Sequence, residues 1–88
     1  MPYIKREDRY RLIPRSVEVA EAKSAGELNY QFTELAIYYF QANGGNYQAI
    51  NDLLGALEGA KLEFYRRIAA PYEETKIEQN GDVYPEMN

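Results

Sequence analysis

The chain contains no cysteine, no histidine and no tryptophan among its 88 residues. Without cysteine, neither a disulfide nor a thiolate metal ligand can hold the fold together. A metal site built from carboxylates alone suits Mg²⁺ or Ca²⁺ better than zinc. The same absences remove the most common general base and the thiol nucleophile. Because Glu58 and Glu63 are also five residues apart and not on one helical face, we predict a protein that is not an enzyme and holds no metal or cofactor.

Positive charge is scarce, with 10 basic residues against 14 acidic ones and a net charge of −4. An acidic chain argues against binding to a DNA or RNA polymer, where a basic surface is required. No apolar run approaches the roughly 18 residues of a membrane span, and the N-terminus has no apolar core of a signal peptide. We therefore expect a cytoplasmic protein that binds neither nucleic-acid polymer nor membrane.

The charge is also unevenly distributed along the chain. Residues 1–15 contain five basic and two acidic side chains, whereas residues 69–88 contain one lysine and five acidic side chains. Opposite charges at the two ends attract one another, either within one chain or between two chains. The sequence leaves these two arrangements open.

Residues 46–70 have the apolar periodicity of one long amphipathic helix. Their apolar positions recur in steps of three and four, which places them on one helical face. Such a helix is about 37 Å long, which exceeds the width of a compact domain of this size. Gly55 and Gly59 lie one turn apart, a spacing that permits close approach of another helix or a ligand. The stripe consists of Tyr47, Ile50, Leu54, Leu57, Lys61, Phe64 and Ile68.

A second helix is predicted over residues 25–43. Ser24 and Glu27 have the spacing of a capping box, and the segment that follows is apolar nearly all round, so it needs cover on more than one side. Gly44 and Gly45 can end this helix, and Asn46 can cap the next. A loop this short predicts that the two helices are antiparallel neighbours.

The predicted fold is therefore all-α: an antiparallel helical hairpin of two long helices with short flanking helices, in one domain that assembles as a homo-oligomer, a dimer or higher. Pro71 is expected to stop or kink the long helix and to start a short one. The flanking segments are a basic N-terminal arm at 1–15, a short helix at 16–24, a short helix at 71–79 and a tail at 80–88.

Tyrosine is unusually common, with nine residues against three phenylalanines. Tyrosine rings stack on nucleobases but also line wet protein interfaces, which is the more ordinary role. Lys61 either extends its ammonium group to solvent or holds an anion, and Arg66 either pairs with Glu63 or meets a phosphate. Asn51 either faces solvent or pairs with a base edge. The candidate ligand-binding residues are Tyr3, Lys5, Arg9, Tyr30, Tyr47, Asn51, Lys61, Tyr65, Arg66 and Tyr84.

The stretches MPYIK, AGELNY, LEGAKLEFYRR and PYEETKIEQNGDVY together resemble an uncharacterised family of small helical proteins from phage and prokaryotic genomes. The resemblance supplies context but no catalytic residues. Some small oligomeric phage proteins sequester cyclic nucleotide signals of bacterial immunity, and this chain is similar to them in size and predicted helicity. By that analogy, two subunits would enclose a cyclic dinucleotide in an anti-defence role.

Two function hypotheses follow. The first is a non-catalytic protein that sequesters a cyclic (di)nucleotide immune signal in a pocket formed by a homo-oligomer, with tyrosines on the bases and Arg9, Lys61 or Arg66 on the phosphates. The alternative is a helical homo-oligomeric interaction or structural module with no small-molecule ligand. An enclosed cavity lined by Tyr, Arg and Asn favours the first, whereas an exposed apolar patch favours the second.

Overall fold

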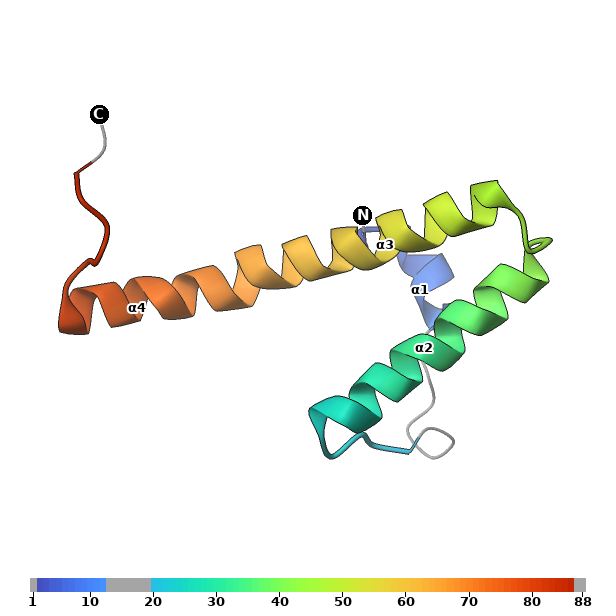
Figure 1. The fold of residues 1–88 in the computed structure, drawn as a ribbon, viewed down its shortest axis with the longest axis horizontal. Helices are drawn as coiled ribbons and strands as arrows, with labels where there is room; N and C mark the ends of the chain where they lie inside the picture. The colour runs from blue at the N-terminus through green and yellow to red at the C-terminus, as the bar shows by residue number, and fades with distance from the viewer. Residues whose placement is uncertain (1, 13–19, 87–88) are drawn as a thin grey trace.

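A computed structural model describes residues 2–12 and 20–86, and over these residues the protein is helical and contains no strand (Figure 1). Part of the short helix predicted at 16–24 lies outside the described residues, and residues 20–24 are not helical. The elements are α1 (Arg6–Leu12), α2 (Ala25–Ala42), α3 (Tyr47–Phe64), the π-helical segment η1 (Tyr65–Ala69) and α4 (Ala70–Asn80).

The helices α3, η1 and α4 are continuous and form one rod, which we call the long helix (Figure 1). At about 1.5 Å per residue it is roughly 50 Å long, and the longest dimension of the molecule is 49 Å. The long helix therefore sets the size of the molecule. It also extends well beyond the end predicted at residue 70, because α4 follows η1 without a break; Pro71 lies in the first turn of α4, as the sequence predicted.

The π-helical turn explains why the chain passes through Pro71. A proline inside an α-helix lacks the N–H that bonds four residues back, and its ring collides with the carbonyl at that position. In η1 the amide of Ala70 donates to the carbonyl of Tyr65, five residues back, so the turn before Pro71 is wider than an α-turn. The wider turn relieves the collision, and the helix continues as α4.

The ends of α2 and α3 are fixed by local hydrogen bonds. The Glu27 amide donates to Ser24 Oγ at 3.1 Å, as predicted, but the Glu27 carboxylate accepts from the Lys23 amide rather than from the Ser24 amide. In the loop, Gly44 and Gly45 have φ values of 93° and 57°, which glycine alone adopts without strain. The Ala49 amide then donates to Asn46 Oδ1 at 2.9 Å, which caps α3 as the sequence predicted.

From this loop α2 and α3 diverge in a V (Figure 1). On the side of α3 toward α2 lie Leu53, Ala56, Leu57 and Ala60. Ala49 is the one buried residue of the described chain, with 2% of its surface exposed, and Leu53 is half-buried.

The predicted stripe is covered only in part: Leu57 lines the cavity between α2 and α3, together with Leu53, Ala56 and Ala60 beside the stripe. Leu54 is 60% exposed, and Ile50, Phe64 and Ile68 are exposed too. Much of the apolar surface of the long helix therefore meets no other part of the described chain.

The chain has an open shape. Its accessible surface is 8382 Å², whereas a compact monomer of 10.2 kDa exposes about 5,300 Å². Its radius of gyration is 17.5 Å, whereas a compact chain of this length has about 12 Å. A single chain thus does not enclose a hydrophobic core.

The left-handed conformation of the loop gives a stability prediction. Gly45→Ala should reduce the free energy of unfolding by about 1 to 2 kcal/mol, because an alanine at positive φ is strained. In addition, its Cβ would lie 3.4 Å from the Phe40 ring. Urea unfolding followed by circular dichroism at one fixed protein concentration measures the change.

The matched control is Gly26→Ala, in the first turn of α2. A Cβ there meets only Ser24 Oγ at 3.9 Å. Since alanine has the higher helix propensity, this variant should be as stable as the natural chain or more stable by up to about 1 kcal/mol. Equal effects of the two substitutions would contradict the assignment of strain to Gly45.

Candidate functional site

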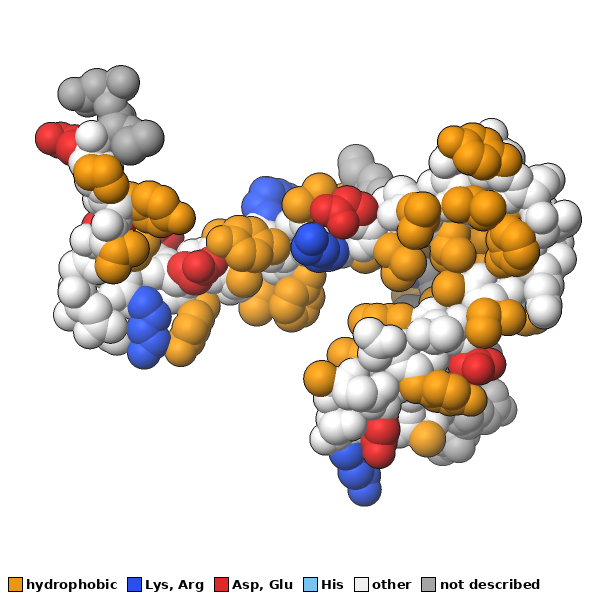
Figure 2. Space-filling model, in the orientation of Figure 1, with side chains coloured by type: hydrophobic (Ala, Val, Ile, Leu, Met, Phe, Trp, Pro, Cys, Tyr) orange, Lys and Arg blue, Asp and Glu red, His pale blue; other side chains and the backbone are white. Residues whose placement is uncertain are grey.

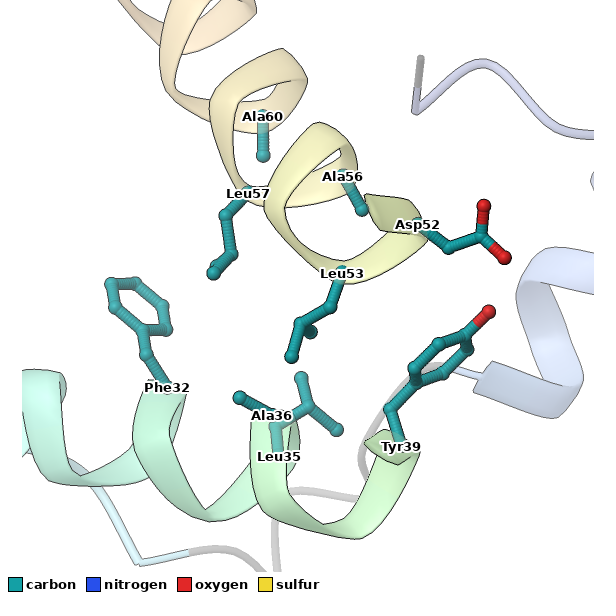
Figure 3. A pocket seen from close by; sticks show the side chains of 9 residues that line it. All are labelled: Phe32, Leu35, Ala36, Tyr39, Asp52, Leu53, Ala56, Leu57 and Ala60. Atoms are coloured by element: carbon teal, nitrogen blue, oxygen red, sulfur yellow. The ribbon is translucent and has the colours of Figure 1, made fainter. Parts of the chain in front are cut away.

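The principal cavity of the described chain is an apolar groove between the arms of the V, which we call the α2–α3 groove (Figure 3). Its volume is about 410 Å³. Figure 3 shows side chains of both helices pointing into it, with the Tyr39 hydroxyl and the Asp52 carboxylate at one end as its polar groups. The lining residues are Phe32, Leu35, Ala36, Tyr39, Asp52, Leu53, Ala56, Leu57 and Ala60.

None of the ten residues predicted to bind a ligand lines the α2–α3 groove. The groove is built instead from apolar side chains of α2 and α3, such as Phe32, Leu35 and Leu53. Its chemistry suits the hydrophobic side chains of another helix, because it offers no cation for a phosphate and few hydrogen-bonding groups for a base.

Two predicted residues, Tyr3 and Arg66, come together where the N-terminal segment meets η1. The Arg67 guanidinium donates to the Tyr3 hydroxyl at 3.5 Å, a long hydrogen bond between residues 64 positions apart. Arg66 is its neighbour in η1, but Arg66 Nε donates to Glu63 at 2.7 Å. This Glu63 contact, with a smaller contribution from Tyr3, raises the pKa of Arg66 above its ordinary value. Two adjacent cations and one hydroxyl thus share a small exposed surface.

A second pair of predicted residues, Tyr65 and Tyr84, lies near α4. The Glu73 carboxylate beside Tyr65 raises the pKa of that phenol above its ordinary value, with a smaller contribution from Tyr84. Because the π-turn adds a residue, the eight positions from Tyr65 to Glu73 span about two full turns and leave both on one face. The segment after α4 also borders a hollow of about 310 Å³, which Glu73, Lys76, Ile77 and Tyr84 help to line.

Three basic candidates remain, and two of them, Lys61 and Arg9, already pair with other groups of the chain. Lys61 forms a salt bridge of 3.5 Å with Glu58, and both side chains are largely exposed. Arg9 Nε donates to the Ile4 carbonyl at 2.9 Å, which ties the start of the chain to α1. Lys5 is exposed just before α1. These three cations do not meet Arg66 in one site within the single chain.

The other candidates are dispersed over α2 and α3. Tyr30 borders a shallow hollow near residues 20–22, where Gln31 donates to the Ala20 carbonyl at 2.8 Å. Tyr47 begins α3 and is exposed, and Asn51 is exposed one turn later. The contact between Tyr3 and Arg67 could not be predicted from the sequence, because the two residues are 64 positions apart and no spacing relates them.

These features define a small all-helical protein with an open apolar groove, and no group of three or more His, Cys, Asp or Glu side chains in residues 2–12 and 20–86 is placed to hold a metal ion. The chain belongs to the family described as a domain of unknown function (DUF6899), whose model matches residues 1–83. No curated protein and no solved structure matches it. Of the helices that the structure describes, none combines the length and the apolar character needed to cross a membrane.

The position of Glu73 beside Tyr65 predicts a titration effect. Glu73→Gln should lower the pKa of Tyr65 toward its ordinary value, because the carboxylate that disfavours the phenolate is removed. Site-resolved NMR of the tyrosine rings as a function of pH measures this pKa. Glu74→Gln removes the same charge one position along α4 and should change it less. Equal shifts in the two variants would show that Glu73 has no special position.

Proposed function

We propose that this protein is a non-catalytic helical module that assembles with copies of itself through the apolar faces of α2 and the long helix. The observation that supports the proposal most is the exposed surface. A single chain exposes about 3,000 Å² more than a compact chain of its mass. Two chains thus expose about 6,000 Å² more than two compact chains, and obligate homodimers bury 2,000 to 5,000 Å² or more in total, so self-assembly would remove a large part of this excess.

The surface to be covered has two parts. One is the α2–α3 groove, and the other is the outer stripe of the long helix, which we define as Ile50, Leu54, Phe64 and Ile68. Figure 2 shows hydrophobic side chains over the α2–α3 half of the molecule and along the long helix. Because the α2–α3 groove and the outer stripe are separate surfaces, a single flat contact with a partner would not cover both. A dimer or higher oligomer whose chains wrap around one another would. In that assembly α2 and α3 act as the antiparallel hairpin.

Gly55 supports the same proposal. Beyond its chain neighbours and the adjacent helix backbone, no atom of the described residues lies within 4 Å of the position that a Cβ of Gly55 would occupy. A glycine inside a helix costs about 1 kcal/mol relative to alanine, and close approach of a second helix offsets such a cost. Since no other described part of the chain approaches Gly55, another chain is the natural candidate. The protein would serve as an interaction or structural module of the cytoplasm.

The second candidate function is sequestration of a cyclic (di)nucleotide immune signal, and one observation favours it. Tyr3, Arg66 and Arg67 form a small surface with two guanidinium groups and an aromatic hydroxyl. A symmetric dimer has two such surfaces, which matches the two phosphates of a cyclic dinucleotide. We rank this second because the groove of the chain is apolar and does not contain the predicted Tyr, Arg and Asn side chains.

Self-assembly predicts a large effect from one exposed leucine. Leu35 lines the α2–α3 groove yet is 68% exposed in the single chain. Leu35→Glu should therefore dissociate the oligomer, because a charge would be buried at the interface. Size-exclusion chromatography with light scattering measures the mass. Gln41→Glu introduces the same charge at an exposed residue of α2 that does not line the groove, and it should leave the oligomer intact. A natural chain that is monomeric at micromolar concentration would contradict the proposal.

Ligand binding predicts a thermal shift. In a screen of cyclic mono-, di- and trinucleotides, a ligand at 100 times its dissociation constant should stabilise the protein by about 2.7 kcal/mol. Arg67→Ala and Tyr3→Phe should weaken this effect without unfolding the protein, whereas Lys61→Ala, paired elsewhere with Glu58, should not. The absence of any shift across the screen would remove this second candidate and leave the first unaffected.

A further inference from the structure

The N-terminal part of the chain carries an exposed group of positive charges. We call Lys5, Arg6, Arg9 and Arg11 the basic end; Glu7 and the half-buried Asp8 are the acidic residues beside it. Arg9 donates to the Ile4 carbonyl. The structure records no salt bridge for any of the four within residues 2–12 and 20–86. The basic end therefore presents net positive charge to solvent.

The opposite end of the long helix carries the complementary charge. We call α4 and residues 81–86 the acidic arm. Its single cation, Lys76, lies over the Tyr72 ring at 5.5 Å and forms no salt bridge within the described part of the chain. Every residue of the arm after Ala70 is exposed. The acidic residues of the arm are Glu73, Glu74, Glu78, Asp82 and Glu86.

The two charged groups do not neutralise one another within one chain. Tyr3 contacts Arg67, which holds the start of the chain near the middle of the long helix, and α1 lies on the side of α2 and α3 (Figure 1). The acidic arm extends the other way, and from Arg67 to Asn80 the helix rises about 20 Å. At physiological ionic strength, screening acts over about 8 Å. Within residues 2–12 and 20–86, the charges of the C-terminal half of the arm thus have no partner in their own chain.

The acidic arm also lacks apolar cover. Beyond α2 the long helix has only its N-terminal contact at Arg67 and the segment that follows α4, and Ile68 and Tyr72 are exposed on it. An arm with both an uncovered apolar face and unpaired charges needs a partner that offers apolar surface beside positive charge. The half of the molecule containing α1, α2 and α3 offers both, because the α2–α3 groove and the basic end belong to it.

We infer that the occupant is a second copy of this chain, placed so that the acidic arm of each copy docks beside the basic end of the other. This inference rests on the proposed self-assembly and adds its orientation. A twofold axis makes the two contacts identical, so one pairing is used twice. Complementary charge sets orientation more than affinity, and the apolar faces supply the affinity.

The experiment uses two charge-reversed variants of the full chain. The first, Arg6→Glu with Arg11→Glu, makes both ends acidic. The second, Glu74→Lys with Glu78→Lys and Glu86→Lys, changes the net charge of the acidic arm from −4 to +2 and so makes both ends basic. Each variant alone places like charges together in both contacts, so its dissociation constant should rise about tenfold or more at low ionic strength. Analytical ultracentrifugation measures the dissociation constant.

Mixing the two variants is the decisive step. In a mixed pair, the reversed basic end of one chain meets the reversed arm of the other, and the second contact keeps its natural charges. The mixture should therefore form hetero-oligomers with nearly the natural dissociation constant. If the charged ends paired within one chain, mixing the two variants would not restore assembly. Combining the substitutions of both variants in a single chain would restore it.

Control variants make the same changes in net charge elsewhere. Lys23→Glu with Thr33→Glu and Gln41→Glu changes the net charge by −4, as the first variant does. Glu21→Lys with Glu34→Lys, Thr33→Lys and Gln41→Lys changes it by +6, as the second variant does, and both controls should assemble as the natural chain does. If all variants assemble as the natural chain does, the orientation is wrong and the proposed self-assembly remains. If the natural chain itself does not assemble, both the proposed function and this inference fail.

Discussion

The structure depends on one long helix whose apolar side chains exceed what its own chain can cover. A small domain stabilises itself by removing apolar surface from water, and the net gain is only a few kcal/mol even when packing is efficient. Here α2 covers one face of α3 near the loop, and Ala49 is the single buried residue of the described chain. Ile50, Leu54 and Ile68 of the long helix are exposed. Since helices gain most of their stability from packing, the proposed assembly would supply the cover that a single chain lacks.

This dependence makes the division of the molecule clear. The half containing α1, α2 and α3 has a groove and positive charge, and the half containing α4 has a helical arm and negative charge. The first half lacks a negatively charged arm, and the second half lacks an apolar groove and positive charge. Because the rod does not fold back on itself, we propose that the two halves meet between two chains. The same logic connects the proposed self-assembly with its proposed orientation.

Local features of the fold follow from the sequence, but the packed faces do not. The caps at Ser24 and Asn46 and the glycine loop depend on residues within four positions, so their spacing predicts them. The face of α3 that meets α2 was predicted only in part: Leu57 of the predicted stripe lines the groove with Leu53, Ala56 and Ala60 beside it, whereas Ile50 and Leu54 are exposed. Small side chains meet α2 near the loop because they let it approach closely. Pro71 lies in the first turn of α4, as predicted, but the expected break before it is missing, since no propensity predicts a π-turn that accommodates the proline. The candidate site was dispersed because the contact of Tyr3 with Arg67 depends on the path of the whole chain.

The π-turn has a consequence for the angular order of the long helix. Successive residues of an α-helix are rotated by about 100° about the axis. One extra residue in η1 therefore turns every side chain of α4 relative to those of α3 by nearly that amount. The turn thus acts as a phase shift, which sets the direction in which the arm presents its carboxylates relative to the face that α3 presents. The length of this one turn, and not any side chain in it, fixes how the two halves of the rod face their surroundings.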